Sequence, residues 1–169
     1  MAPIVSRPWE SDTENNLQMK NLFEAGIADE LKARVARLRP GSERVWGSMM
    51  PAQAMAHCSA SLEWAIGERT PPRAGLFVRI TGRLIKPMVL KDDKPFRRNS
   101  PTAPDLIIHN EPNMEAERVR LCTMIDRFVE AGPDGCTTHA HSFFGPLNPA
   151  EWSILMYKHL DHHLRQFGV

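Results

Sequence analysis

The chain has 169 residues, which is enough for one domain with a sizeable hydrophobic core. Its composition, 42% hydrophobic and 24% charged, is that of an ordinary globular protein, and a net charge of +1 gives no basic surface for nucleic acid. No run of residues reaches the ~18–20 apolar positions of a membrane span. The first residues do not resemble a signal peptide. The three cysteines, an odd number without a CxxC pair, favour a reduced, cytoplasmic location.

Helical spacing dominates the sequence and strand patterns are nearly absent, which predicts an all-α fold. We assign residues 1–24 to an N-terminal extension, in which SDTE at 11–14 has the pattern of a capping box. The first firm helix is expected over 25–38, with a buried stripe formed by Ile27, Leu31, Val35 and Leu38. A second helix is expected over 51–66, between a proline that suits a first turn and a glycine that suits a helix end.

The segment 73–90 predicts an additional, amphipathic helix. Its basic residues fall on one face, namely Arg79, Arg83 and Lys86. Its apolar residues fall on another, namely Phe77, Ile80, Leu84 and Met88. We interpret it as a surface helix that packs its apolar face on the core. The alternative is an adaptor helix that binds a membrane or another protein, with its basic residues facing solvent.

A segment with four prolines, 91–112, follows and predicts a long irregular connection that is either a structural crossover or a lid. A helix is then expected over 113–131, with a buried stripe formed by Val119, Cys122, Ile125 (or Met124) and Val129. The last helix is expected over 149–167, because Asn148 and Glu151 have the spacing of a capping box. We therefore predict a single domain, residues 25–169, built as a four-helix bundle with the amphipathic helix and the crossover loop added.

Three histidines lie close together in the last helix, and their angular positions separate them. Each residue turns the helix by 100°. His163 and His159 lie about 20° and 60° from the apolar direction of this helix, whereas His162 lies about 120° from it. The opposite face carries Lys158, Asp161 and Arg165, which we expect to be solvated. His159 and His163 are thus expected to point into the bundle and His162 to be peripheral.

Two inward imidazoles one turn apart suit a metal ion, because i and i+4 residues have Cβ atoms about 5–6 Å apart. The alternative is a pair of core histidines hydrogen-bonded to backbone or side chains. Leu160 stands where the HExxH motif of zinc proteases has its glutamate, so that motif is absent. A metal needs a third ligand, and His57 is the best candidate because it lies on another predicted helix, although for His57 taken alone a satisfied structural histidine is the default reading.

Other residues have weaker claims on a site. His141, just before the last helix, and Trp64, on the face of His57, are candidates for substrate contact. Glu63 and His141 are the candidate general bases, and Gln53 is a candidate for orienting His57. Cys58 is interpreted as a small buried residue rather than a ligand.

Two segments, PAQAMAH at 51–57 and HLDHHLRQF at 159–167, resemble the DinB/YfiT-like superfamily of metalloenzymes. The longer stretches RVWGSMMPAQAMAHCSASL, KPFRRNSPTAPDLI and HSFFGPLNPAEWSILMYKHLDHHLRQFG resemble one branch of it, a family of unknown function. The resemblance covers most of the chain from about residue 22. One departure is Met50, where a serine or threonine cap is typical.

The resemblance implies a four-helix bundle, a homodimer, and a divalent metal held by His57, His159 and His163. Zinc or nickel suits three imidazoles, with iron as a further option. It also implies a small-molecule substrate and transfer or isomerisation chemistry that uses a low-molecular-weight thiol such as bacillithiol or mycothiol. The alternatives that we retain are a metal-dependent hydrolase, a metal- or ligand-binding bundle without turnover, and the adaptor described above.

Overall fold

The computed structural model describes residues 19–169, so the SDTE segment lies outside the described residues. This range is all-α and contains no β-strand, which confirms the predicted fold class. The main helices match the expected ranges to within three residues at each end. They are α1 (Ile27–Arg37), α2 (Pro51–Ala65), α3 (Leu76–Leu90), α4 (Met114–Ala131) and α5 (Pro149–Arg165).

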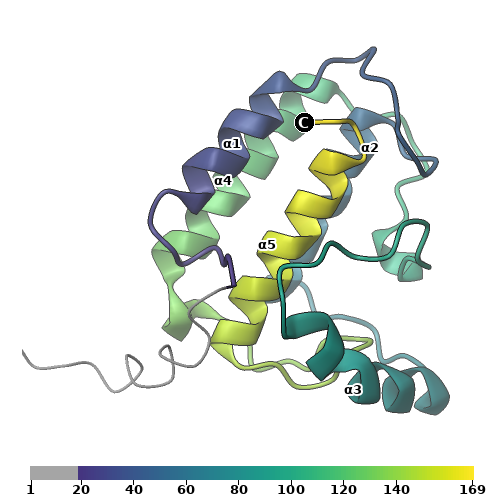
Figure 1. Cartoon of the computed structure of the whole chain (residues 1–169), viewed down its shortest axis with the longest axis vertical. Helices are drawn as coiled ribbons and strands as arrows, with labels where there is room; N and C mark the ends of the chain where they lie inside the picture. The colour runs from purple at the N-terminus through teal and green to yellow at the C-terminus, as the bar shows by residue number, and fades with distance from the viewer. Residues whose placement is uncertain (1–18) are drawn as a thin grey trace, which may run out of the picture.

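Four of the helices form a closed bundle, in which α1 packs on α4 and α5, and α2 also packs on α4 and α5 (Figure 1). The start of α2 lies beside the start of α4, because Gln53 bonds to the carbonyl of Asn110 at 3.0 Å. Their ends also meet, since Thr137 donates its backbone N–H to Ala65. The two helices therefore run parallel, and α3 with its long connection provides the crossover that a parallel pair requires.

The bundle core contains the stripe predicted for α1, since Ile27, Leu31, Val35 and Leu38 are all buried. The core also includes Met19 and Leu22, which precede α1. The backbone N–H of Leu22 bonds to the carbonyl of Ser153 on α5. Met19 and Leu22, which lie in the segment that the sequence analysis assigned to an extension, thus contribute to the helical core.

The stripe of α4 differs in part from the expectation. Val119 is 60% exposed, and the fully buried positions are Leu121, Met124, Ile125 and Phe128. The true stripe is shifted round the helix because Phe128 stacks on Phe23 with ring centroids 5.1 Å apart. Phe23 comes from the segment before α1, which the sequence pattern did not assign to the core.

α5 is buried on nearly all sides, so of the three charged residues that were expected to be solvated only Arg165 is exposed. Asp161 and Lys158 are only 4% and 3% exposed. Asp161 pairs with Arg34 of α1 at 2.8 Å. Lys158 donates to the carbonyls of Val89 and Asp92 at the C-terminal end of α3, where a cation suits the helix dipole. Charged residues are tolerated there because neighbouring elements satisfy them.

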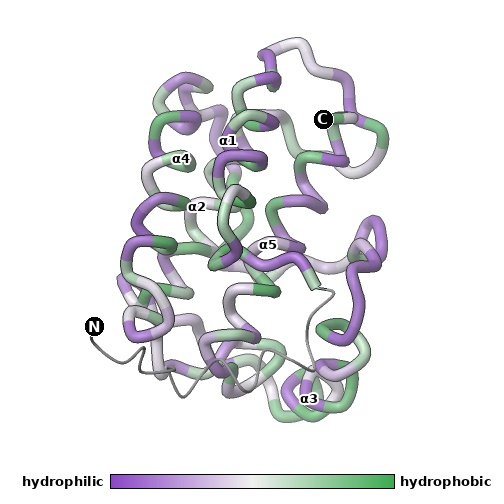
Figure 2. The backbone as a smooth tube through the Cα atoms, turned by 60° about the vertical axis from the view of Figure 1, so that its left-hand side comes forward, coloured by the Kyte–Doolittle hydropathy of each residue, from purple (hydrophilic) through white to green (hydrophobic). Residues whose placement is uncertain are grey.

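α3 lies across one end of the bundle and contacts α5 (Figure 2). The face predicted to pack on the core is exposed instead: Phe77 is 81% exposed and Leu84 76%. The helix docks through its other side, which includes Gly82 and the partly buried Ile85. Apolar residues occur on two sides of this helix, and the sequence analysis selected the wrong one.

The basic residues of α3 are turned partly toward the protein. Lys86 pairs with Glu151 of α5 at 2.7 Å and donates to the carbonyl of Pro146. Arg79 is partly buried, and of the three only Arg83 is exposed. This arrangement differs from the adaptor hypothesis, which required all three to face solvent.

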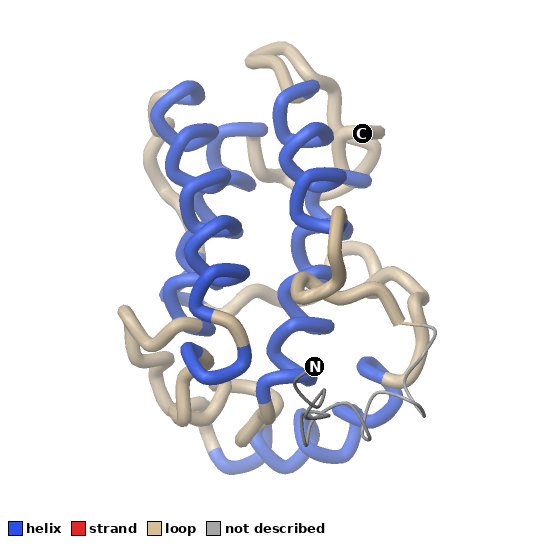
Figure 3. The backbone as a smooth tube through the Cα atoms, turned by 90° about the vertical axis from the view of Figure 1, so that its left-hand side faces the viewer, coloured by secondary structure: helices blue, strands red, loops and turns tan. Residues whose placement is uncertain are grey.

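The connection between α3 and α4 runs along the side of the bundle (Figure 3). It contains a short 3₁₀ turn, Pro104–Leu106, whose Leu106 packs against Ala60 and Trp64 of α2. Gln53 holds the following residues through the carbonyls of Ile108 and Asn110. The segment therefore serves as a structural crossover that is anchored to α2.

None of the helices among the described residues is both long and apolar enough to cross a membrane.

Candidate metal centre

Three histidines from two antiparallel helices meet inside the bundle. His57 lies in the middle of α2, and His159 and His163 lie one turn apart on α5. Their potential ligand atoms all fall within 4.8 Å of one another. The Nε2 atoms of His57 and His159 are 2.8 Å apart, and the three ring centroids are separated by 4.7 to 4.9 Å.

The Nδ1 atoms of two of these rings are held by partners outside the cluster. Nδ1 of His57 lies 2.9 Å from the carbonyl oxygen of Leu106, so this nitrogen carries the proton and donates. Nδ1 of His163 lies 3.0 Å from the side chain of Gln166, which accepts through Oε1. Each imidazole is thus set in the tautomer whose Nε2 lone pair is free for a ligand.

Burial favours the neutral form of all three rings. It lowers the pKa of His57 and holds the pKa of His159 well below the usual value, with the neighbouring histidines adding to the effect. It lowers the pKa of His163 to about 3. Neutral imidazole is the form that binds a metal ion. His57 is buried, whereas His159 and His163 remain partly accessible to solvent.

The donor set fits a divalent transition metal. Three imidazole nitrogens suit zinc, nickel, iron or copper, whereas magnesium and calcium prefer oxygen ligands. Three protein ligands also leave at least one coordination position for water or a substrate, as in catalytic zinc sites. Without a metal, the 2.8 Å contact between the two Nε2 atoms is a hydrogen bond in which a neutral His159 donates its Nε2–H to the free Nε2 of His57, and a bound metal would take the place of that proton.

His162 stays outside the cluster, as the facing argument expected, but it is 9% exposed rather than peripheral. Trp46 and Phe96 cover it, with ring centroids 5.6 and 5.9 Å away. Both belong to irregular segments that wrap round α5. Helical facing alone cannot predict burial by such segments.

Three other candidates have different partners. Gln53 accepts from the backbone N–H of Met50, so it caps α2 and anchors the crossover instead of orienting His57. Glu63 pairs with Arg69 and Arg120, so its carboxylate is committed to ion pairs. Cys58 is buried, and burial raises the pKa of its thiol, as expected for a structural cysteine.

His141 and Trp64, the two candidates for substrate contact, lie together. Their rings make an edge-to-face contact at 6.0 Å, and His141 also contacts Phe144 and Trp152. Nδ1 of His141 accepts from the backbone N–H groups of Phe143 and Phe144, so its Nε2 carries the proton. Burial lowers the pKa of His141 to about 4. His141 is therefore a hydrogen-bond donor rather than a ready general base.

Sequence reasoning missed the two groups that orient the histidines. Gln166 follows His163 by three residues, a spacing that places both on one helix face, and this signal was available. Leu106 acts through its backbone carbonyl, so no residue-type pattern could have revealed it. Its position depends on the path of the crossover segment.

The fold and the site define a helical protein with a three-histidine cluster inside its bundle. The chain belongs to the family described as protein of unknown function (DUF1569), whose model matches residues 14–168. No curated protein and no solved structure matches the chain significantly. Because the family description names no activity, the chemistry of the site carries the functional argument.

Proposed function

We propose that this protein is a divalent-metal-dependent enzyme of the DinB/YfiT-like type, with His57, His159 and His163 as ligands and zinc or nickel as the metal. One observation carries the proposal. Three neutral imidazoles converge, and partners outside the cluster orient two of them, Leu106 for His57 and Gln166 for His163. A metal held there supplies a Lewis acid that lowers the pKa of a bound thiol or water.

For the reaction, we propose transfer or isomerisation with a low-molecular-weight thiol and a small electrophilic substrate. In a transfer, the thiolate sulfur forms a bond to an electrophilic carbon, the leaving group departs with its electron pair, and the thiol proton goes to solvent. The indole of Trp64 and the Nε2–H of His141 would form the wall that positions the substrate. The supporting features are the depressed pKa values of the cluster and the ordered, aromatic surroundings of His141.

The first test is the metal content of the purified protein. We expect about one zinc or nickel ion per chain, and loss of most of it in the His57→Ala, His159→Ala and His163→Ala variants. His162→Ala is the matched control, since His162 lies on the same helix but outside the cluster, and should keep its metal. Full metal content in the His159 or His163 variant, measured by elemental analysis, would exclude this site.

The second test separates the enzymatic options. The metal-loaded protein is supplied with bacillithiol or mycothiol and 1-chloro-2,4-dinitrobenzene, and separately with a p-nitrophenyl ester without thiol. Thioether formation that disappears in His159→Ala supports the transferase. Ester hydrolysis without thioether formation supports the hydrolase, and inactivity of the loaded protein in a wider substrate screen supports a binding protein without turnover.

We also propose that two copies of the chain associate through α3. Its exposed face carries large apolar residues while its basic residues Arg79 and Lys86 turn partly toward the protein. Large contiguous apolar patches on a protein surface commonly mark interaction sites. The residues that form it are Leu76, Phe77, Val78, Ile80, Leu84 and Met88.

A further inference from the structure

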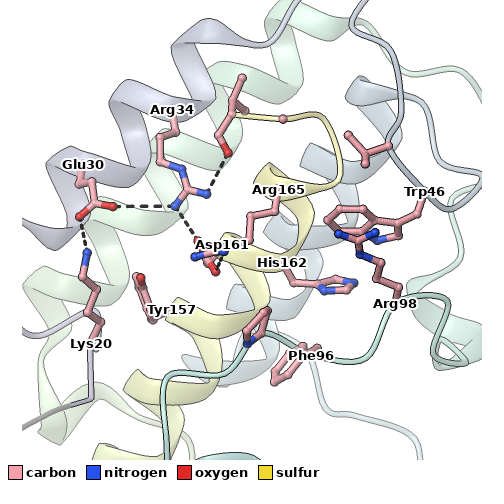
Figure 4. A pocket seen from close by; sticks show the side chains of 14 residues that line it. Lys20, Glu30, Arg34, Trp46, Phe96, Arg98, Tyr157, Asp161, His162 and Arg165 are labelled. Atoms are coloured by element: carbon pink, nitrogen blue, oxygen red, sulfur yellow. Dashed lines mark hydrogen bonds and ion pairs between the residues drawn. The ribbon is translucent and has the colours of Figure 1, made fainter.

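A cavity lies beside α5, and Figure 4 shows the side chains that line it, among them Tyr157, Asp161 and His162 of that helix. Its volume is about 530 Å³, within the range of roughly 300–1,000 Å³ that small-molecule sites occupy. Its walls come from segments far apart in the sequence: the start of the described chain with α1, the α1–α2 loop, the start of the crossover and α5. None of the three clustered histidines lines it.

The acidic groups in the lining are already neutralised by cations. One carboxylate oxygen of Asp161 forms an ion pair with Arg34 at 2.8 Å, and the other forms one with Arg165 at 2.7 Å. Glu30 pairs with Lys20 at 3.0 Å. Both acidic side chains of the described lining are therefore already paired with cations.

One cation of the lining has a different environment. The guanidinium of Arg98 lies over the ring of Trp46, with 4.2 Å between its central carbon and the ring centroid. Among the described residues it forms no ion pair with a carboxylate. Stacking on the indole leaves the guanidinium edge, with its fork of N–H donors, available to an anion. Arg98 is exposed, so a ligand can reach it without displacing the protein.

The remaining lining is aromatic. Trp46 and Phe96 lie on either side of the His162 ring, at centroid distances of 5.6 and 5.9 Å, and Tyr157 lies further along α5. Trp46 and Phe96 are partly exposed at the cavity surface. Aromatic faces of this kind favour a flat ring, which gains dispersion contacts by offset stacking or edge-to-face packing.

From these observations we propose that the cavity is a second binding site, for a small planar aromatic or heteroaromatic molecule that carries one anionic group. Its ring lies against Trp46 and Phe96, and its carboxylate or sulfonate pairs with Arg98. A multiply charged anion fits less well, because Arg34, Arg165 and Lys20 are already paired with acids. The site uses none of the three clustered histidines, although Gln166 bonds both to His163 and to the backbone carbonyl of Trp46.

The test uses 8-anilinonaphthalene-1-sulfonate, a fused aromatic sulfonate whose fluorescence rises when it leaves water. We expect one site per chain in the full-length protein. Arg98→Ala and Trp46→Ala should each weaken binding about tenfold, a loss of about 1.4 kcal/mol. Both side chains lie in irregular segments at the surface, so the fold should survive, which circular dichroism and thermal unfolding check.

Matched controls separate this site from other surfaces. Arg97→Ala removes a neighbouring exposed cation outside the lining and should bind normally. Leu84→Ser reduces the exposed apolar face of α3, which also attracts such dyes, and should bind normally. The uncharged N-phenyl-1-naphthylamine should bind the wild type and Arg98→Ala equally. Unchanged binding in both the Arg98 and Trp46 variants, or loss in Leu84→Ser, would overturn the proposal.

The His159→Ala variant tests the cavity separately from the metal site. It lacks a proposed metal ligand but leaves the cavity lining intact, so it should bind the dye with wild-type affinity. Loss of dye binding in this variant, with the fold retained, would show that the cavity is not an independent site.

Discussion

Gln166 links the metal centre to the loop before α2 through one side chain. Its Oε1 accepts from Nδ1 of His163, and its Nε2 donates to the carbonyl of Trp46 at 3.0 Å. The residue is only 3% exposed, so water does not readily replace it. The orientation of His163 therefore depends on a residue that is not a ligand itself.

We expect Gln166→Ala to weaken zinc binding about 10–100-fold, because His163 loses the acceptor that fixes its tautomer. Competition against a colorimetric chelator measures the affinity. Gln166→Glu is the matched control, since a carboxylate still accepts from Nδ1, and it should bind zinc more tightly than Gln166→Ala. Wild-type affinity in Gln166→Ala would show that Gln166 does not support the site.

The buried histidines should make the metal-free protein sensitive to acid. Burial lowers the pKa of His163 to about 3 and that of His141 to about 4, below about 6.5 in the unfolded chain. The unfolded state therefore binds more protons below pH 6.5, so stability is full above that pH and falls as the pH decreases. Each of these histidines should lower the free energy of unfolding at pH 5 by about 2 kcal/mol, since one pKa unit corresponds to about 1.36 kcal/mol.

Urea unfolding of the metal-free protein at several pH values between 7.5 and 5 measures this loss. His141→Phe removes one titrating group, and its free energy of unfolding should decrease less steeply with falling pH than that of the wild type. The two proteins are compared by how steeply the free energy of unfolding changes with pH, and not by its absolute value. The absolute value also changes, because the substitution removes the acceptor for the backbone N–H groups of Phe143 and Phe144. Identical slopes in the two proteins would contradict the assignment of His141 as a buried neutral histidine.

Among the helices, α3 docks through a close approach that only glycine permits. A Cβ at Gly82 would lie 1.9 Å from the carbonyl oxygen of Phe143 in the loop before α5. That contact involves backbone, so it is not relieved by moving a flexible side chain. The position of α3 across the end of the bundle therefore depends on this residue.

Gly82→Ala should destabilise the protein by about 1–3 kcal/mol, because α3 or the loop must shift. Helix propensity alone predicts the opposite, a gain of up to about 1 kcal/mol. Gly75→Ala, at the N-cap of α3, is the matched control, since a Cβ there meets nothing within 4 Å. Thermal unfolding compares the two variants, and a stabilised Gly82→Ala would mean that the close approach is absent in solution.

At the scale of the whole molecule, the exposed face of α3 bears on assembly. If two copies associate through it, light scattering at micromolar concentration should give twice the chain mass. Leu84→Glu places a charge in the centre of the face and should give the single-chain mass. Glu68→Lys changes an exposed charge outside α3 and is the control. A single-chain mass for the wild type at all concentrations would exclude the dimer.

Local patterns predicted the helices well and their surroundings less well. Asn148 and Glu151 form the expected capping box, since Asn148 accepts from the Glu151 N–H and Glu151 accepts from the Asn148 N–H. His159 and His163 share a face because helical geometry alone requires it. The burial of Lys158 and Asp161 was not predictable from α5, because it depends on α1, on the end of α3 and on the crossover that packs around it.

The sequence by itself determined the all-α class, the helix ranges and the pairing of His159 with His163, because periodicity and capping act within a few residues. The place of His57 on another predicted helix made it the candidate third ligand, and the resemblance to a known superfamily implied that role for it. Only the tertiary structure decided that His57 reaches them, that Leu106 and Gln166 orient the rings, and that α3 presents its apolar face outward. Those features arise from contacts between remote segments, several of them through backbone atoms, which residue type does not encode.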